Sequence, residues 1–276
     1  MQHIRTLDTQ LHNAPVWLTI GAYDGIHLGH QALIHELVSQ AHKSHEQAVV
    51  VSLFPHPSLI LGRNHAPFYL TSPDDRAELL EKLGVDVLYT YPFTKEVSNL
   101  RPQQFLQTLV ERIAIRQLWV GDDFALGKDR QGSLEVLGEL GKEFGYTLFI
   151  FKQVQVGDTI VSSSFIRERL MAGDLQTVKN MLGRNYSARG SLFSTTDKTT
   201  EPAHSFFFQT WDEQLLPPAG LYTCTLWLKG MEFECVADLI SLVNRTNPLI
   251  EIKMLNFDCP FSSEPANLEF LQAISS

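Results

Sequence analysis

Two histidines in a glycine-rich segment are the residues of this chain best suited to chemistry. Residues 21–30 read GAYDGIHLGH, with His27 and His30 three positions apart. On a helix, this spacing places both side chains on one face. The segment also contains three glycines, Gly21, Gly25 and Gly29. Because glycine lets a bulky anion approach the backbone closely, the segment predicts a site for the phosphates of a nucleoside triphosphate, without the lysine of a P-loop.

The segment lies between a predicted strand and a predicted helix. An apolar run at 16–20 precedes it, and an amphipathic run at 31–41 follows it. A strand–turn–helix unit directs backbone N–H groups and the positive end of a helix dipole at one point, which favours phosphate. Two other interpretations stay open: a turn with a purely structural role, and a metal site at the histidines, for which no third ligand follows at a suitable spacing.

The first part of the chain alternates between strand-like and helical patterns. Strands are expected at 16–20, 48–54, 85–91, 117–121 and 147–151, and helices near 29–43, 73–83, 102–114 and 132–144. This alternation predicts an α/β fold with a doubly wound parallel sheet. Ligands bind such sheets at the carboxyl ends of the strands, which is where the histidine segment lies.

A second candidate anion site begins at three consecutive serines. Ser162, Ser163 and Ser164 open a predicted helix that carries Arg167 one turn further on. Serines before a helix are ordinary N-caps. Together with a guanidinium, their hydroxyls and the free N–H groups also suit phosphate oxygens.

The pattern changes after residue 184. Strands are expected at 204–210, 220–228, 231–238 and 249–257, with a polar loop at 194–203. The sequence therefore predicts two domains, at 1–184 and 185–276, the second small and mostly β.

Composition narrows the class of protein. The net charge of −9 argues against nucleic acid or an anionic membrane as a general partner. The three cysteines lack a CxxC spacing, which suggests free thiols in a reducing cytosol. Neither a signal-peptide pattern nor an apolar run of membrane-spanning length is found, so a cytoplasmic location is expected.

Several motifs in the same order resemble the bacterial FAD synthetase family, the bifunctional riboflavin kinases/FMN adenylyltransferases. Residues 21–30 resemble GxFDGxHxGH, with Tyr23 in place of Phe. Residues 54–57 (FPHP) resemble FxPHP, and 121–132 (GDDFALGKDRQG) resemble GxDFxFGxxRxG. Residues 162–167 (SSSFIR) resemble SSTxIR, and 182–187 (LGRNYS) resemble LGRPYS.

The resemblance implies transfer of AMP from ATP to FMN, giving FAD and pyrophosphate, in a Rossmann-like nucleotidyltransferase domain. It implies Mg²⁺ with ATP, ATP and FMN as the small-molecule substrates, and no resident metal site. The implied catalytic residues are His27, His30 and Arg167. The implied ATP-binding residues are Gly21, Tyr23, Asp24, Gly25, Gly29, Ser162, Ser163 and Ser164. The implied flavin-binding residues are Phe54, His56, Asp123, Phe124 and Arg130.

The resemblance is weaker after residue 184, where the family has its riboflavin-kinase barrel. Residues 188–218 contain no GFPTAN, the family segment for Mg²⁺ and nucleotide phosphate. Residues 249–257 resemble ExHLLDF, the strand of the kinase base, so Glu251 occupies that position. A base without a phosphate and metal site does not transfer a phosphoryl group efficiently. We therefore expect a degenerate kinase-like domain.

Three alternatives remain at this point. The chain has both activities with an unusual kinase site, or binds flavin or nucleotide without catalysis, or transfers AMP to another acceptor, such as pantetheine phosphate or nicotinamide mononucleotide. The FPHP and GDDFALGKDRQG segments favour flavin.

Overall fold

The computed structural model describes residues 1–5, 12–194, 206–240, 249–254 and 263–274. The chain forms two compact units: Met1–His65 with Arg76–Val161, and Ala66–Asp75 with Ser162–Ser276. Most of the polar loop predicted at 194–203, and the ends of two predicted strands at 204–205 and 255–257, lie outside the described residues.

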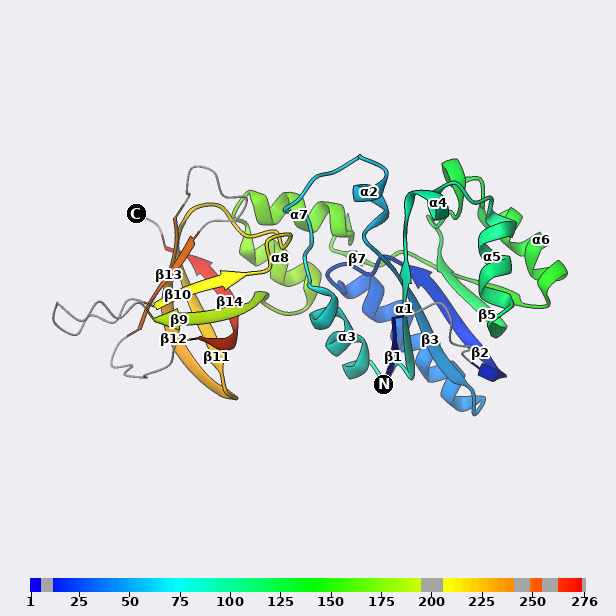
Figure 1. Ribbon diagram of the computed structural model, residues 1–276, viewed down its shortest axis with the longest axis horizontal. Helices are drawn as coiled ribbons and strands as arrows, with labels where there is room; N and C mark the ends of the chain where they lie inside the picture. Colours follow the sequence, from blue (N-terminus) through cyan, green and yellow to red (C-terminus); the bar gives the residue numbers. More distant parts are fainter. Residues whose placement is uncertain (6–11, 195–205, 241–248, 255–262, 275–276) are drawn as a thin grey trace. The chain divides into compact units, whose positions relative to one another are not determined.

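The first unit is built on a parallel six-stranded sheet (Figure 1), with the order β1-β4-β3-β2-β5-β6. Its strands are β1 (Gln2–Ile4), β2 (His12–Gly21), β3 (Gln47–Phe54), β4 (Val87–Pro92), β5 (Ile113–Gly121) and β6 (Thr147–Phe151). From β2 the chain adds β3 and β4 on one side, then β5 and β6 on the other. The turn after β2 therefore lies at the topological switch point, where ligands bind in doubly wound sheets.

Helices cover both faces of this sheet, which confirms the predicted α/β fold. The longer helices are α1 (Leu28–Lys43), α3 (Pro73–Lys82), α5 (Pro102–Val110) and α6 (Leu134–Phe144). Short elements follow several strands: α2 (Pro57–Ile60), α4 (Lys95–Ser98), the 3₁₀ turn η1 (Lys128–Arg130), and the β7–β8 hairpin (Gln155–Val156, Thr159–Ile160).

Alternation along the strands divides the core of the first unit into two layers. Trp17 and Val50 pack with Leu37 of α1, while Leu18 and Val51 pack with Phe105 of α5 on the opposite face. Because successive strand side chains point to opposite faces, a strand buried on both sides reads as a continuous apolar run. This is the pattern that predicted these strands.

The second unit contains two helices and a closed antiparallel barrel. The helices are α7 (Ser163–Met171) and α8 (Leu175–Leu182). The barrel strands are β9 (Tyr186–Ser194), β10 (Phe206–Thr210), β11 (Gly220–Leu228), β12 (Met231–Ile240), β13 (Leu249–Lys253) and β14 (Glu264–Ala273), in the order β10-β13-β12-β11-β14-β9. The barrel confirms the predicted small β domain.

Two barrel strands, β9 and β14, were not predicted from the sequence. β9 contains Gly190, and a glycine inside a strand usually weakens it. In the barrel, a Cβ added at Gly190 would lie 2.1 Å from the Gln209 carbonyl oxygen of β10. Glycine therefore permits the close approach of these two strands.

The division between the two compact units does not fall at residue 184. Helices α7 and α8 belong to the same unit as the barrel, and so do residues 66–75. A boundary between two functional domains at 184 stays a prediction. Within the part of the chain that the structure describes, none of the helices combines the length and the hydrophobicity that spanning a membrane requires.

Candidate active site

The turn between β2 and α1 has an unusual backbone. Tyr23 (φ 51°), Gly25 (φ 84°) and Ile26 (φ 39°) all lie in the left-handed region. A positive φ is rare for tyrosine and is an outlier for a β-branched residue such as isoleucine. The turn ends at His27, the N-cap of α1, whose first turn contains no acidic residue. The N–H groups and dipole at this helix end therefore suit an anion.

The N-cap contact fixes the hydrogen-bonding role of His27. Its Nδ1 accepts a hydrogen bond from the backbone N–H of His30, at 3.3 Å. A nitrogen that accepts this bond has no proton, so the neutral ring carries its proton on Nε2. The His30 ring stacks on the His27 ring, with centroids 3.6 Å apart and an interplanar angle of 16°. The structure thus brings the two predicted catalytic histidines together.

Two of the glycines make room for aromatic rings. A Cβ at Gly29 would lie 3.1 Å from Cε1 of His27. A Cβ at Gly21 would lie 3.0 Å from the ring of Tyr23. Both distances are shorter than a Cβ normally tolerates, so these glycines allow the rings to lie against the turn.

The Tyr23 hydroxyl forms a hydrogen bond within the protein. Thr19 Oγ1 donates a hydrogen bond to the Trp119 carbonyl oxygen at 2.8 Å, so the Tyr23 hydroxyl donates to Thr19 Oγ1. Burial raises the pKa of Tyr23, which keeps the phenol protonated. The Tyr23 ring meets His30 edge-on, with centroids 5.0 Å apart. Tyr23 therefore supports His30, and its predicted role in ATP binding stays a prediction.

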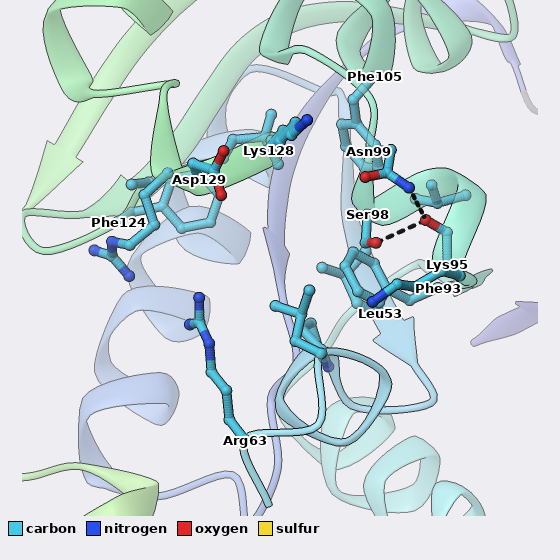
Figure 2. A pocket seen from close by; sticks show the side chains of 17 residues that line it. Leu53, Arg63, Phe93, Lys95, Ser98, Asn99, Phe105, Phe124, Lys128 and Asp129 are labelled. Carbon is cyan, nitrogen blue, oxygen red and sulfur yellow. Dashed lines mark hydrogen bonds between the residues drawn. The ribbon is translucent and has the colours of Figure 1, made fainter.

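A pocket of about 340 Å³ lies at the carboxyl ends of β3, β4 and β5 (Figure 2), on the same edge of the sheet as the histidine turn. Its cationic lining residues are Arg63, Lys95, Lys128 and Arg130, and its one acidic lining residue is Asp129. Its apolar lining residues include Leu53, Leu61, Phe93, Phe105, Phe124 and Leu126. Figure 2 shows the Arg63 side chain extending toward the side of the pocket where Phe124 lies. An apolar pocket with a few charged groups suits a planar aromatic ligand.

Two of the five predicted flavin residues, Phe124 and Arg130, line this pocket. The other three, Phe54, His56 and Asp123, are sequence neighbours of lining residues. His56 Nδ1 accepts the Ser58 N–H at 3.1 Å as the N-cap of α2, and Arg130 donates to the Asp123 carbonyl oxygen at 2.7 Å.

Sequence reasoning missed most of the pocket lining. Arg63, Phe93 and Lys95 belong to no motif that we compared. The one available signal was position, because Phe93 and Lys95 directly follow β4 and so belong to the carboxyl edge of the sheet.

In the second unit, the predicted phosphate-binding serines begin α7. The Ser162 hydroxyl accepts the Phe165 N–H at 3.3 Å, as an N-cap does, and Ser164 is exposed. Arg167 is 8% exposed; its Nε donates to the Phe68 carbonyl oxygen at 2.9 Å, and its guanidinium lies 3.8 Å from the Phe68 ring centroid. These contacts hold the guanidinium in place, while contact with pyrophosphate stays a prediction.

Glu251 lies on β13 between Ile250 and Ile252, which are buried in the barrel. Strand alternation therefore directs Glu251 to the outer face. Its carboxylate lies 3.6 Å from the Lys253 ammonium, which lies at the same distance from the Asp238 carboxylate. The Lys253 ammonium therefore lies between two carboxylates on this face of the barrel.

The sequence left open a metal site at the two histidines. Within the described ranges, no group of three or more His, Cys, Asp or Glu side chains is arranged to hold a metal ion.

The doubly wound sheet places the chain in the α/β class, and comparison with known proteins specifies the family. Residues 9–165 match the family model for FAD synthetase. The chain is 28% identical to a bifunctional riboflavin kinase/FMN adenylyltransferase of Listeria monocytogenes, over 92% of this chain and 82% of that one. It is 30% identical to the protein of that description from Haemophilus influenzae, over 93% and 85%.

The chain therefore belongs to the FAD synthetase family and is an enzyme of that family. A solved structure described as a macrolide-efflux protein from Streptococcus pneumoniae shares the fold, with a TM-score of 0.85 over 99% of this chain and 91% of that one. At 21% sequence identity, that likeness concerns the fold alone.

Proposed function

We propose that the chain transfers AMP from ATP to the phosphate of FMN, releasing pyrophosphate and forming FAD. One observation carries the proposal: the stacked histidines at the start of α1 and the pocket both lie on the carboxyl edge of one sheet. This arrangement supplies an anion site and a site for an aromatic ring within one unit. Family membership supports the same reaction.

The reaction needs positioning and charge stabilisation more than covalent chemistry. An FMN phosphate oxygen attacks the α-phosphorus of ATP, and the bond to the bridging oxygen of pyrophosphate breaks. Negative charge develops on the phosphoryl oxygens. The Nε2–H of His27, the His30 ring and the N–H groups of α1 would stabilise this charge, and a preorganised donor has its largest effect there.

Arg167, Ser163 and Ser164 would bind the departing pyrophosphate. The guanidinium of Arg167 is already fixed by Phe68, so little side-chain entropy is lost when it binds an anion. ATP would enter as its Mg²⁺ complex, because Mg²⁺ in such reactions is held mainly by phosphates and water.

The pocket would receive the isoalloxazine ring. Phe124 and Phe93 offer apolar contact, and Arg130, Lys95 and Asp129 offer polar contacts to the ring edge or the ribityl chain. In this proposal Phe54, His56 and Asp123 support the pocket wall from neighbouring positions.

We further propose that riboflavin kinase activity is lost. The sequence contains no GFPTAN, and Glu251 faces outward beside Lys253. A general base must lie within reach of the proton it abstracts and beside a bound nucleotide. Retention of both activities is the alternative, and it requires a nucleotide site of a different type.

The experiment is incubation with FMN, ATP and Mg²⁺, followed by separation of flavins and measurement of pyrophosphate. FAD and pyrophosphate in equal amounts support adenylyl transfer. Binding of FMN and ATP without either product would instead identify a non-catalytic flavin- and nucleotide-binding protein.

A further inference from the structure

Asp24, in the middle of the histidine turn, is buried. It is 1% exposed and lies between two left-handed residues, Tyr23 and Gly25. A carboxylate deprived of water needs a partner of opposite charge or hydrogen-bond donors.

That partner comes from α3. Arg76 is 2% exposed, and its Nη2 lies 3.8 Å from Oδ1 of Asp24. Its Nη1 donates to the Ser52 hydroxyl at 3.0 Å, and that hydroxyl donates to the Ala22 carbonyl oxygen at 3.3 Å. Arg76 thus contacts the turn at two points. It lies directly beside the Asp24 carboxylate, and it is linked to the Ala22 carbonyl oxygen through the Ser52 hydroxyl.

The turn needs such support because its backbone is strained. Left-handed conformations of Tyr23 and Ile26 persist only where surrounding contacts hold them. Ile26 is fixed by burial and by the Gln31 side-chain amide, which donates to its carbonyl oxygen at 2.8 Å. The Asp24–Arg76 pair holds the preceding part of the turn.

We propose that Arg76 is a positioning residue, which acts through Asp24 and Ser52 to hold the turn in the conformation that aims His27 and His30 at the phosphates. Asp24 then serves as an internal anchor for the turn, and its carboxylate does not contact ATP. The inference rests on the proposed function, because its test measures FAD synthesis.

The turn that Arg76 supports is directly connected to the two histidines. His27 is the N-cap of α1 and directly follows Ile26, so a change in the turn rotates the His27 ring. The His30 ring stacks on that ring and follows it. The flavin pocket is lined by other residues, so FMN binding is independent of Arg76.

The test compares Arg76→Gln, Arg76→Lys and Ser52→Ala in the full chain. We expect kcat of Arg76→Gln to fall about 100-fold, as for an ångström-scale misplacement of catalytic groups. Arg76→Lys retains the charge and should recover part of this loss, and Ser52→Ala should lose a few-fold. The dissociation constant for FMN, followed by flavin fluorescence, stays at the wild-type value in all three.

A double variant separates positioning from ATP contact. Asp24→Asn with Arg76→Gln removes both buried charges, so the fold-loss in kcat of the double variant should be smaller than the product of the two single fold-losses. The matched control is Arg116→Gln, which removes an exposed ion pair with Glu46 in the same unit and should change nothing.

Two results would overturn the inference. One is wild-type kcat in a folded Arg76→Gln variant; if that variant does not fold, wild-type kcat in both Arg76→Lys and Ser52→Ala has the same meaning. The other is an Asp24→Asn variant with a raised KM for ATP, beside an Arg76→Gln variant that keeps the wild-type value. Absence of FAD with the wild-type chain would refute the proposed function instead.

Discussion

The histidine turn and the outer face around Glu251 are the two regions where the family resemblance places chemistry, and they differ in what surrounds the reactive groups. At the turn, a strained backbone, a helix end without acids and two stacked imidazoles are arranged for an anion. Around Glu251, on the outer face of the barrel, the Lys253 ammonium lies 3.6 Å from the carboxylate. The barrel has kept its closed sheet. If the kinase activity is lost, as we propose, the barrel keeps its fold without that activity, and function must be argued from the site.

The largest effect should come from the turn itself. His30→Ala should lower kcat for FAD synthesis by roughly two orders of magnitude or more, the scale for loss of one preorganised donor. The measurement is steady-state kinetics with FMN and ATP, beside FMN binding, which should not change. His35→Ala on the exposed side of α1 is the control. Near-wild-type turnover in His30→Ala would remove this histidine from the mechanism.

A smaller effect is expected at Arg167. Arg167→Gln should raise the KM for ATP roughly tenfold or more, since a hydrogen bond to a charged group contributes about 1.5–3 kcal/mol. Arg169→Gln, on the same helix and paired with Glu168, should leave it unchanged. Equal ATP kinetics for the two variants would contradict the assignment of Arg167 to pyrophosphate.

A smaller effect, on FMN binding, is expected from a substitution in the pocket. Phe124→Ala should weaken FMN binding up to roughly tenfold and leave the KM for ATP unchanged, because an aromatic contact is worth about 0.5–1.5 kcal/mol. Phe149→Ala, on β6 outside the pocket, is the control. If both variants bind FMN as the wild type does, the flavin binds elsewhere.

The smallest effect concerns stability in the second unit. Asp174 caps α8 by accepting the Thr177 N–H at 3.0 Å, and hydrogen bonds from Thr177 lower its pKa below 3.8. Its cap is therefore complete above pH 3.8 and is lost as the pH falls through the lowered value. Asp174→Ala should cost about 1 kcal/mol near neutral pH.

Calorimetry of both proteins from neutral pH down through the acidic range measures this difference in stability. FAD synthesis at neutral pH should be the same in both. A stability difference that grows on acidification would contradict the lowered pKa of Asp174 and its role as the cap.

Much of the fold and of the histidine turn could be predicted from the sequence, because the signals for them lie in contiguous residues. Val49, Val50 and Val51 are all buried, so β3 reads as a continuous apolar run. The glycines and histidines of 21–30 are contiguous, which makes the turn visible as a motif. The barrel strands β11 and β12 are joined by a short turn at Lys229 and Gly230, a clear hairpin signal.

The remaining features depend on residues distant in the sequence. Arg76 reads as an ordinary helical residue, and its contact with Asp24 arises only when α3 packs near the end of β2. The pocket collects Arg63, Phe93 and Asp129 from three segments that are far apart in the sequence. The ion pair of Glu251 with Lys253 is an i, i+2 contact on one strand face, which the sequence permits but does not require.

One paired assay tests the central claim most directly. The protein is incubated with ATP and Mg²⁺ and with either FMN or riboflavin, and FMN and FAD are resolved by chromatography; Glu251→Gln is run in parallel. We predict FAD from FMN at equal rates in both proteins, and no FMN from riboflavin in either. FMN formed from riboflavin by the wild type and abolished in Glu251→Gln would contradict the account and identify a working kinase site in the barrel.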